Sequence, residues 1–506
     1  MADNKKIAKN TLFLYARMLL IMGVSLYSSR VILDKLGVDD YSLYNVVGGI
    51  VGLLSFLSGT LSSGTSRFLT YELGSNDKSR LQLTFSTAFF THFLLAVLFV
   101  VLLETVGLWY VYNKLVVADD RFYAALIVFQ ISIFASLISI MQIPYTSLII
   151  AHEDMGVYAY IGIFDALARL GVIYLITLTP FDKLIVYALL IALVHLFVVF
   201  FYWLYCHRHY LESHLSLKYD KGIFKALLGF SGWNVLAHLS ETLKMQGYLV
   251  LLNLFFQPFV VAAQTIGNQV AGGVMQFIAN FRNAINPQII KLYAAEEYEE
   301  SKRLTLSTTV LVFDLVLILG LPTIFVMKTI MNIWLVEVPA YTVIFTQFIV
   351  AQRILSVFDA SFYVPMMAAA KIKTNSLISI ITGPGVFVLL YFIYKLGGDV
   401  MWMQYIGIIV FAAYGFVIKP WLLVRDVRGY SYNEIYNCFF VCLKVAIVSI
   451  ALSLFFYYLV GNETIGASVL LFVLSFLSVA VASFMFMEPI MRKKLIQLCL
   501  NKILKH

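Results

Sequence analysis

The chain has 506 residues, of which 61% are hydrophobic and 13% are charged. Soluble domains are about half apolar and about one quarter charged, so a string of soluble domains is excluded. The 41 Phe and 31 Tyr residues exclude a disordered chain. The formal net charge is +8, but the basic residues are scattered singly between apolar runs, which disfavours nucleic acid as a partner. A membrane protein with many spans is the class that remains.

Apolar runs of about the length of a membrane-spanning helix follow one another along the chain. The first begins after Lys5, Lys6 and Lys9, exceeds the apolar part of a signal peptide, and is predicted to remain as the first helix. The expected fold class is an all-α polytopic membrane protein with fourteen transmembrane helices, at residues 10–33, 41–65, 81–108, 122–143, 156–178, 184–205, 227–256, 259–282, 304–327, 341–362, 374–394, 400–424, 438–460 and 464–487.

The distribution of basic residues predicts the orientation of these helices. With the N-terminus inside, most of the 36 Lys and Arg residues fall in segments on the cytoplasmic side. Both termini are therefore expected to be cytoplasmic. The four cysteines form no CxxC pair and would lie at or near the reducing side as free thiols.

An internal repeat divides the predicted helices. Leu83–Thr87 aligns with Leu304–Thr308, and Pro144 aligns with Pro365 at the same offset of 221 residues. The offset equals six helices, so the two halves share one orientation and are related by a pseudo-twofold axis along the membrane normal. The predicted parts are a six-helix lobe at 1–222, a second at 223–436, and two further helices with a basic tail at 437–506.

No motif in the sequence predicts an enzyme. A Gly-Lys dipeptide is absent, which excludes a P-loop, and the longest segment outside the membrane, Cys206 to Ala226, is too short for a catalytic domain. The histidines of the segment 207–214 are interpreted as part of a solvated basic loop rather than a metal site. We therefore expect neither a metal nor a cofactor.

Ionisable residues inside the spans are the main functional candidates, because each costs about 2.5 to 3.5 kcal/mol to insert. Asp165 with Arg169 and Glu241 with Lys244 are spaced to neutralise one another on a helix. Other arginines have no such neighbour and predict a cationic site for an anionic, phosphate-like ligand: Arg17, Arg30, Arg67, Arg282 and Arg353. Arg30, Arg67 and Arg282 lie near span ends, where reaching to the interface is the alternative explanation.

Further polar residues mark the same helices. Glu104, Asp314 and Asp359 are candidates for proton or sodium coupling, or alternatively partners of the arginines. Polar stripes at helical spacing on the seventh and eighth helices predict a hydrated cavity wall, with interhelical hydrogen bonding as the alternative: Ser231, Asn234, His238, Gln264, Asn268, Gln276 and Asn280.

Several short segments resemble one known family. They are Phe230-Ser231-Gly232-Trp233-Asn234, Leu252-Asn253-Leu254-Phe255-Phe256, Ala284-Ile285-Asn286-Pro287-Gln288-Ile289, Ile143-Pro144-Tyr145 and Ile149-Ile150-Ala151-His152-Glu153. The chain is similar to the polysaccharide-transport branch of the multidrug/oligosaccharidyl-lipid/polysaccharide exporter superfamily, which includes O-antigen flippases. The likeness covers about the first 430 residues.

This resemblance implies a flippase of the bacterial inner membrane. Its substrate would be an undecaprenyl-diphosphate-linked oligosaccharide, moved from the cytoplasmic to the periplasmic leaflet for O-antigen-like polysaccharide assembly, alongside polysaccharide polymerase machinery. The lobes would alternate in access around a cationic cavity lined by the helices of Arg17, Arg30 and Arg282, with Pro144 and Pro365 as hinges. The alternative is an ion-coupled multidrug or cation antiporter of the same fold. The first two helices of this chain carry arginines, however, whereas such an antiporter would need a carboxylate there to hold its cationic substrate.

Overall fold

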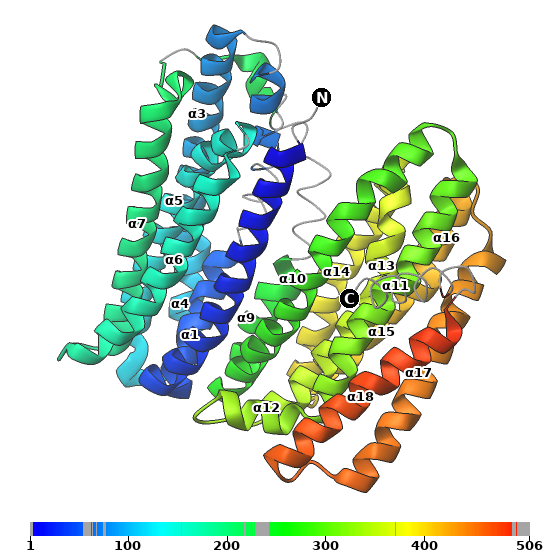
Figure 1. Ribbon diagram of the computed structural model, residues 1–506. Coiled ribbons are helices and arrows are strands. Elements are labelled where there is room, and N and C mark those ends of the chain that lie inside the picture. Colours follow the sequence, from blue (N-terminus) through cyan, green and yellow to red (C-terminus); the bar gives the residue numbers. More distant parts are fainter. Residues whose placement is uncertain are drawn as a thin grey trace, which may run out of the picture. The chain divides into compact units, whose positions relative to one another are not determined.

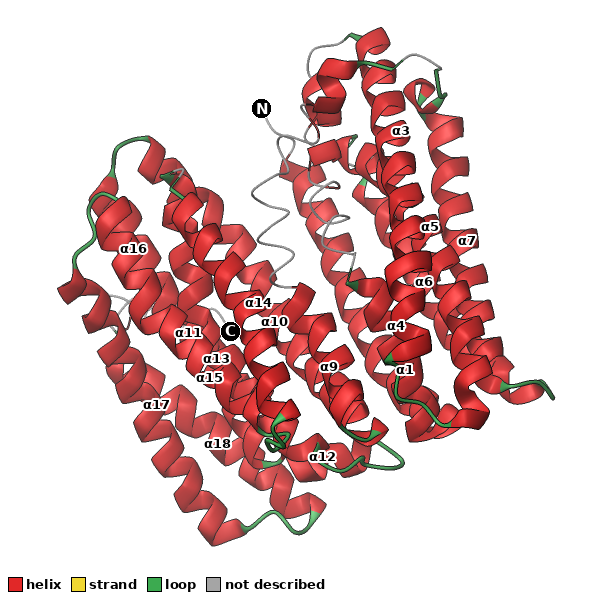
Figure 2. Ribbon diagram, turned by 180° about the vertical axis from the view of Figure 1, so that it is seen from behind, coloured by secondary structure: helices red, strands yellow, loops and turns green. Residues whose placement is uncertain are grey.

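The structure is a computed structural model that describes residues 4–53, 62, 64–66, 68–73, 77–152, 154–216, 219–225, 227, 242–369, 371–487 and 492. For residues 4–19, 244, 276–281, 283, 284, 287, 291 and 294 it describes the backbone alone. The described residues form helices and loops and no strand, which confirms the predicted all-α class (Figure 2).

The chain divides into two compact units. Unit 1 comprises Met1–Thr265, Leu335–Pro339 and Ser376–Val400, and unit 2 comprises Ile266–Trp334, Ala340–Asn375 and Met401–His506. The lobes predicted at 1–222 and 223–436 remain a prediction. Each unit is described by itself.

Unit 1 is built mainly from long helices that lie side by side (Figure 1). A π-helical turn, η1 (Leu103–Gly107), joins α3 to α4, and another, η5 (Leu243–Gly247), leads into α9. The helices of unit 1 are α1 (Asn4–Gly52), α3 (Lys78–Leu102), α4 (Leu108–Asn113), α5 (Phe122–Ala151), α6 (Met155–Leu175), α7 (Lys183–His209), α9 (Tyr248–Phe255), the start of α10 (Pro258–Ala294) and most of α14 (Lys373–Lys395).

The core of unit 1 lies between α1, α3, α5, α6 and α7. Phe85, Leu148, Ile149, Ile173 and Tyr202 are at most 2% exposed in one hydrophobic cluster. This burial explains why α5 continues beyond the predicted end at residue 143. The helix passes through Pro144 because the turns that follow it pack into the core, which compensates for the lost backbone hydrogen bond.

Gly37 gives α1 its kink. Its φ of 82° is the left-handed conformation that glycine adopts without strain, and it separates the two predicted spans 10–33 and 41–65. The chain bends here without an intervening loop. The predicted division of this segment is therefore confirmed, and a kink within α1 replaces the predicted turn.

Unit 2 contains the remainder of α10 and the helices that follow it. A π-helical turn, η6 (Tyr414–Ile418), joins α15 to α16. The helices are α11 (Tyr298–Phe325), α12 (Met327–Trp334), α13 (Thr342–Ala368), α15 (Trp402–Ala413), α16 (Lys419–Asp426), α17 (Tyr432–Val460) and α18 (Ile465–Phe486). Helices α11, α17 and α18 pack against one another, and α13 lies between α11 and the α15–α16 segment.

Small side chains allow α17 and α18 to approach α11 closely. Ser449 and Ser453 of α17 and Ser475 and Ser478 of α18 are buried in this packing. Small residues are enriched where membrane helices meet, because lipid supplies little hydrophobic force to drive helices together. The opposite face of α17 exposes Phe440, Leu443, Ile447 and Leu454 among other large apolar side chains, as expected of a surface in contact with lipid.

Ten helical segments within the described residues are long and apolar enough to cross a membrane. The remaining predicted spans overlap α1, α9 and α10. The predicted fold, a polytopic helical membrane protein, therefore agrees with the structure.

Candidate functional site

The structure describes only part of the predicted cationic cavity. The side chains of Arg17, Arg67, Ser231, Asn234, His238, Gln276 and Asn280, and both members of the predicted pair Glu241 and Lys244, lie outside the residues or side chains that the structure describes. The predicted residues Arg282, Arg353 and Asp359 are described in full and lie in unit 2. They define the candidate site.

An ion pair between a buried lysine and a partly exposed aspartate lies at the centre of this site. The Nζ atom of Lys419 is 3.0 Å from Oδ1 of Asp359, and the Lys419 side chain is 2% exposed. The same ammonium lies 4.9 Å from the centre of the Tyr363 ring, which is a cation–π contact. Lys419 falls within the predicted span 400–424, and the structure shows that its side chain is enclosed between helices.

The backbone around Lys419 explains its position. The π-helical turn η6 ends at Ile418, directly before Lys419, and the inserted residue of such a turn changes which face the following side chains occupy. Gly415 lies against α13, where an added Cβ would come within 3.1 Å of Phe358 Cβ. The glycine therefore lets η6 approach α13 closely enough for Lys419 to reach Asp359.

Arg282 extends the pair into a larger cluster. Its Nη2 atom donates a hydrogen bond to the backbone carbonyl of Ala360, the residue after Asp359. The Asp359 carboxylate also attracts the Arg282 guanidinium electrostatically. Two cations from α10 and α16 thus surround one carboxylate of α13. Among the described residues, this group of three carries a net positive charge inside the unit.

Arg353 lies on α13, six residues before Asp359, which corresponds to about 9 Å along the helix. Its guanidinium is 6.0 Å from the centre of the Phe411 ring of α15. Within the described part of the chain, no carboxylate forms an ion pair with it. Arg353 therefore has most of its hydrogen-bonding capacity available for an anionic ligand.

The other described candidates are engaged in contacts. Arg30, Gln264 and Asn268 each have an interaction partner. Glu104 lies in η1 and accepts a hydrogen bond of 3.1 Å from the amide of Gln130. The predicted hinge prolines Pro144 and Pro365 both lie inside helices, α5 and α13. These residues therefore form no second cationic site within the described part of the chain.

The predicted local pair in unit 1 is confirmed. Arg169 Nε donates to Asp165 Oδ1 over 2.8 Å, one turn away on α6. Arg169 Nη2 also meets Nε2 of His195 on α7, a contact that sequence analysis missed. The arginine is thus satisfied within its own unit, which supports the structural interpretation of this pair.

A second ion cluster in unit 1 was also missed. Arg121, at the start of α5, binds the Asp40 carboxylate with two hydrogen bonds of 2.9 and 2.7 Å and also contacts the carboxylate of Asp182. Burial raises the pKa of Asp40 above its ordinary value, although Arg121 opposes the shift. Burial also acts to raise the pKa of Asp182, but hydrogen bonds from Arg121 and from the amides at the start of α7 outweigh it and lower that pKa. The cluster connects the kink of α1 to the starts of α5 and α7.

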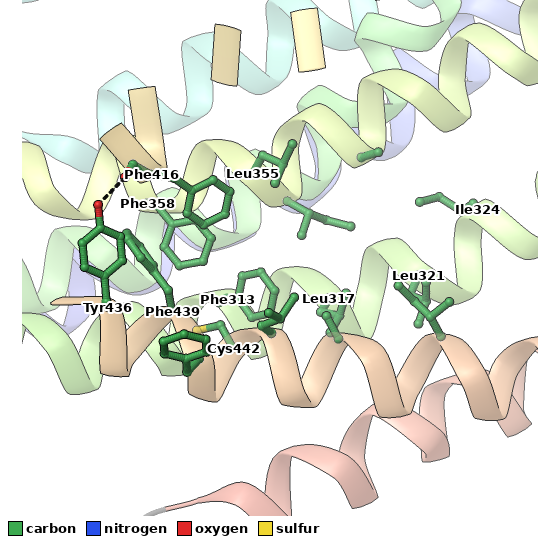
Figure 3. Close-up of a pocket in the computed structure, with 16 residues that line it drawn as sticks. Phe313, Leu317, Leu321, Ile324, Leu355, Phe358, Phe416, Tyr436, Phe439 and Cys442 are labelled. Atoms are coloured by element: carbon green, nitrogen blue, oxygen red, sulfur yellow. Dashed lines mark hydrogen bonds between the residues drawn. The ribbon is translucent and has the colours of Figure 1, made fainter. Parts of the chain in front are cut away.

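Unit 2 also contains an apolar cavity of about 660 Å³ between α11, α13 and α17. Figure 3 shows its aromatic side chains gathered at one end, where Phe358 and Phe439 meet edge to face at 4.9 Å. The hydroxyl of Tyr436 is turned away to donate to the carbonyl of Phe416. No charged group lines this cavity within the described residues, so it does not extend the cationic site.

Comparisons with known proteins identify the fold. No protein-family model and no curated protein matches the chain. Among solved structures, an inward-facing multidrug resistance MATE family transporter of the MOP superfamily is similar, with a TM-score of 0.65 and 12% identity over 80% of this chain and 94% of that chain. A multidrug resistance MATE family transporter of the MOP superfamily in an outward-facing conformation is also similar, with a TM-score of 0.56 and 16% identity over 83% of this chain and 95% of that chain.

A MOP superfamily transporter from Pyrococcus furiosus, for which a reverse polarity of the binding pocket is described, has a TM-score of 0.60 and 13% identity over 83% of this chain and 95% of that chain. At such identities the likeness establishes the fold. The chain therefore has the fold of MOP superfamily transporters.

Proposed function

We propose that this protein is a flippase that moves an undecaprenyl-diphosphate-linked oligosaccharide across the bacterial inner membrane. The proposal joins the family resemblance of the sequence with the transporter fold. The product would enter the assembly of an O-antigen-like surface polysaccharide. Polysaccharide polymerase machinery would be the partner that uses it.

The excess of cations in the α10–α13–α16 region of unit 2 is the observation that carries the proposal. Arg353 has no carboxylate partner among the described residues, and Arg282 and Lys419 share the single carboxylate of Asp359. An unpaired arginine inside a membrane protein is costly and is typical of a functional site. Its planar guanidinium can bind a phosphate with two parallel hydrogen bonds.

In this mechanism the diphosphate and the glycan enter the protein while the lipid tail stays in the bilayer. Arg353 and Arg282 bind the diphosphate, with Arg17, Arg30 and Arg67 as the predicted contribution of the first lobe. The polar side chains of the seventh and eighth helices bind the sugars. The two predicted lobes then alternate in access, as parallel repeats do in other transporters, and both termini stay cytoplasmic.

A cation antiporter is the second candidate, because two of the similar structures are named as multidrug transporters. Such an antiporter requires a carboxylate that is free to bind a cationic substrate. Asp359 is already paired with Lys419, which counts against it in this role. The two candidates therefore differ in the charge of the substrate that the protein transports.

The test is leaflet transfer of a fluorescent diphosphate-linked glycolipid in proteoliposomes. We expect transfer by the native protein, and an apparent KM raised about tenfold or more in Arg353→Ala, since a hydrogen-bonded charge contributes about 1.5 to 3 kcal/mol. Lys444→Ala is the matched control, because Lys444 is also a basic residue on a spanning helix but is exposed on α17.

Arg17→Ala tests the predicted first-lobe contribution in the same assay. Unchanged transfer in both Arg17→Ala and Arg353→Ala would remove the arginine mechanism. Efflux of a cationic dye, with no transfer of any diphosphate-linked lipid, would favour the antiporter.

A further inference from the structure

The three acidic residues predicted as coupling candidates differ in their surroundings. Glu104 accepts a hydrogen bond from Gln130, and Asp359 pairs with Lys419. Asp314, on α11, has a buried Oδ1 atom without a hydrogen-bond partner within the described residues. A carboxylate oxygen that is buried without a hydrogen bond is costly inside a membrane protein, which makes Asp314 a candidate functional group.

Asp314 lines a cavity of about 480 Å³ between α11, α17 and α18. Ser483 of α18 lines the same cavity, and its Oγ atom is likewise buried without a partner among the described residues. The walls between them are largely apolar and include Leu311, Val441 and Val445. The side chains of Asp314 and Ser483 thus line one cavity and lie close enough to interact with each other.

The cavity extends from Asp314 toward the start of α11. There Lys302 Nζ lies 2.7 Å from both Glu299 Oε2 and Glu434 Oε1. Lys302 and Asp314 are twelve residues apart, about 18 Å along the helix. The lysine is therefore neutralised at the mouth of the cavity and is too distant to pair with Asp314.

Within the described residues, the groups that face Asp314 include no nearby cation. From α17 the titratable groups are the thiols of Cys438 and Cys442, with Glu434 at the mouth. From α11 itself they are Glu299, Glu300, Lys302 and Arg303, all at the mouth, and α18 contributes the hydroxyl of Ser483. None of the described residues supplies a cation to neutralise the Asp314 carboxylate, and a small cation that enters through the cavity could do so.

We propose that Asp314 is a proton-binding site of unit 2, reached through this cavity. The carboxylate takes up one proton from water that enters the cavity, which forms a neutral carboxylic acid, and the acid returns that proton to water at the mouth when it ionises. The neutral form can donate its proton to Ser483 Oγ in a hydrogen bond. The charged form instead requires hydration of the cavity, so proton binding changes how closely α18 can pack against α11.

The inference deepens the proposed function, since it identifies the ion that would drive the transport cycle and therefore rests on that function. The basic residues predict that the start of α11 is cytoplasmic. A proton that is taken up in the outward-open state and released on that side would move in the direction opposite to the exported glycan. The proton gradient would thereby drive the return of the protein to its starting state.

The first test is proton binding itself, measured on the purified full-length protein by infrared difference spectroscopy between alkaline and acidic pH. We expect a band of a protonated, buried carboxyl group that is lost in Asp314→Asn. Glu463→Gln, in the exposed turn between α17 and α18, is the matched control and should keep the band. Ser483→Ala should shift its frequency and the pH at which it appears.

The second test is transport in proteoliposomes. A pH gradient should stimulate glycolipid transfer by the native protein, and Asp314→Asn should lose that stimulation while exchange without a gradient continues. An infrared band that persists in Asp314→Asn would overturn the proposal, as would stimulation by a sodium gradient instead of a pH gradient. If no diphosphate-linked lipid is transferred, the proposed function fails, and the infrared experiment still decides whether Asp314 binds a proton.

Discussion

Replacing Lys419 by methionine tests the central ion pair of unit 2. Methionine retains most of the packing of the methylene chain but removes the ammonium that lies 3.0 Å from Asp359. At an effective dielectric constant of about 20, two charges at that distance attract by about 5 kcal/mol. The cost of removing the two charges from water offsets much of this attraction in the native protein.

The expected destabilisation follows from the carboxylate that is left behind. Removing one partner of a buried pair costs about 3 to 5 kcal/mol, because the other charge stays buried without compensation. Arg282 remains near Asp359 and the carboxylate is partly exposed, so we expect the lower end, about 3 kcal/mol. The double variant Lys419→Met/Asp359→Asn should recover to within about 1 kcal/mol of the native protein.

The assay is equilibrium unfolding of the purified protein in mixed detergent micelles, with the two single variants and the double variant forming a mutant cycle. The expected coupling energy is about 2 kcal/mol or more. Tyr363→Leu serves as a separate measure of the cation–π contact and should cost about 1 kcal/mol. A coupling energy near zero would refute the reasoning, since it would mean that the two charges do not depend on each other.

Two further predictions concern groups outside the candidate site. Because the pKa of Asp182 is lowered in the folded protein, its stabilising contribution is present above the ordinary carboxyl pKa and is lost as pH falls through the folded value. Asp182→Asn should therefore flatten the fall of the melting temperature on acidification, and an unchanged profile would exclude the Arg121 contact as its cause. Ser431→Ala should lower the unfolding free energy by about 1 kcal/mol, measured by equilibrium unfolding in the same mixed micelles. The reason is that Ser431 caps α17, because its Oγ atom accepts a hydrogen bond from the backbone N–H of Glu434 and donates one to the Glu434 carboxylate. An unchanged unfolding free energy would show that the cap is dispensable.

The sequence predicted the helices well because their cause is local. Each span needs a run of apolar side chains, and such runs can be recognised without any knowledge of neighbouring helices. The pair of Asp165 and Arg169 was predictable for the same reason, since one helical turn places both groups together. Helix ends were less predictable, because α5 passes through Pro144 only with the support of the core around it.

The contacts that define the site were not predictable in this way. Asp359 and Lys419 are 60 residues apart, and Arg121 and Asp40 are 81 residues apart. Helical periodicity places a side chain on a face but does not say which helix that face meets. Lys419 also stands in the last turns of the predicted span 400–424, from which a lysine can reach solvent, and the π-helical turn before it determines that it points inward instead.

The ionisable groups of the spanning helices therefore separate into two kinds. Arg169 and Lys419 are each held by a carboxylate of their own unit, so their removal should affect folding more than transport. Arg353 and Asp314 have no ionic partner among the described residues, although an unpaired charge inside a membrane is costly. Folding alone gives no reason to keep them. Under the proposed function, Arg353 would bind the anionic ligand and Asp314 the proton, and a transporter that couples the two needs both residues unpaired at rest.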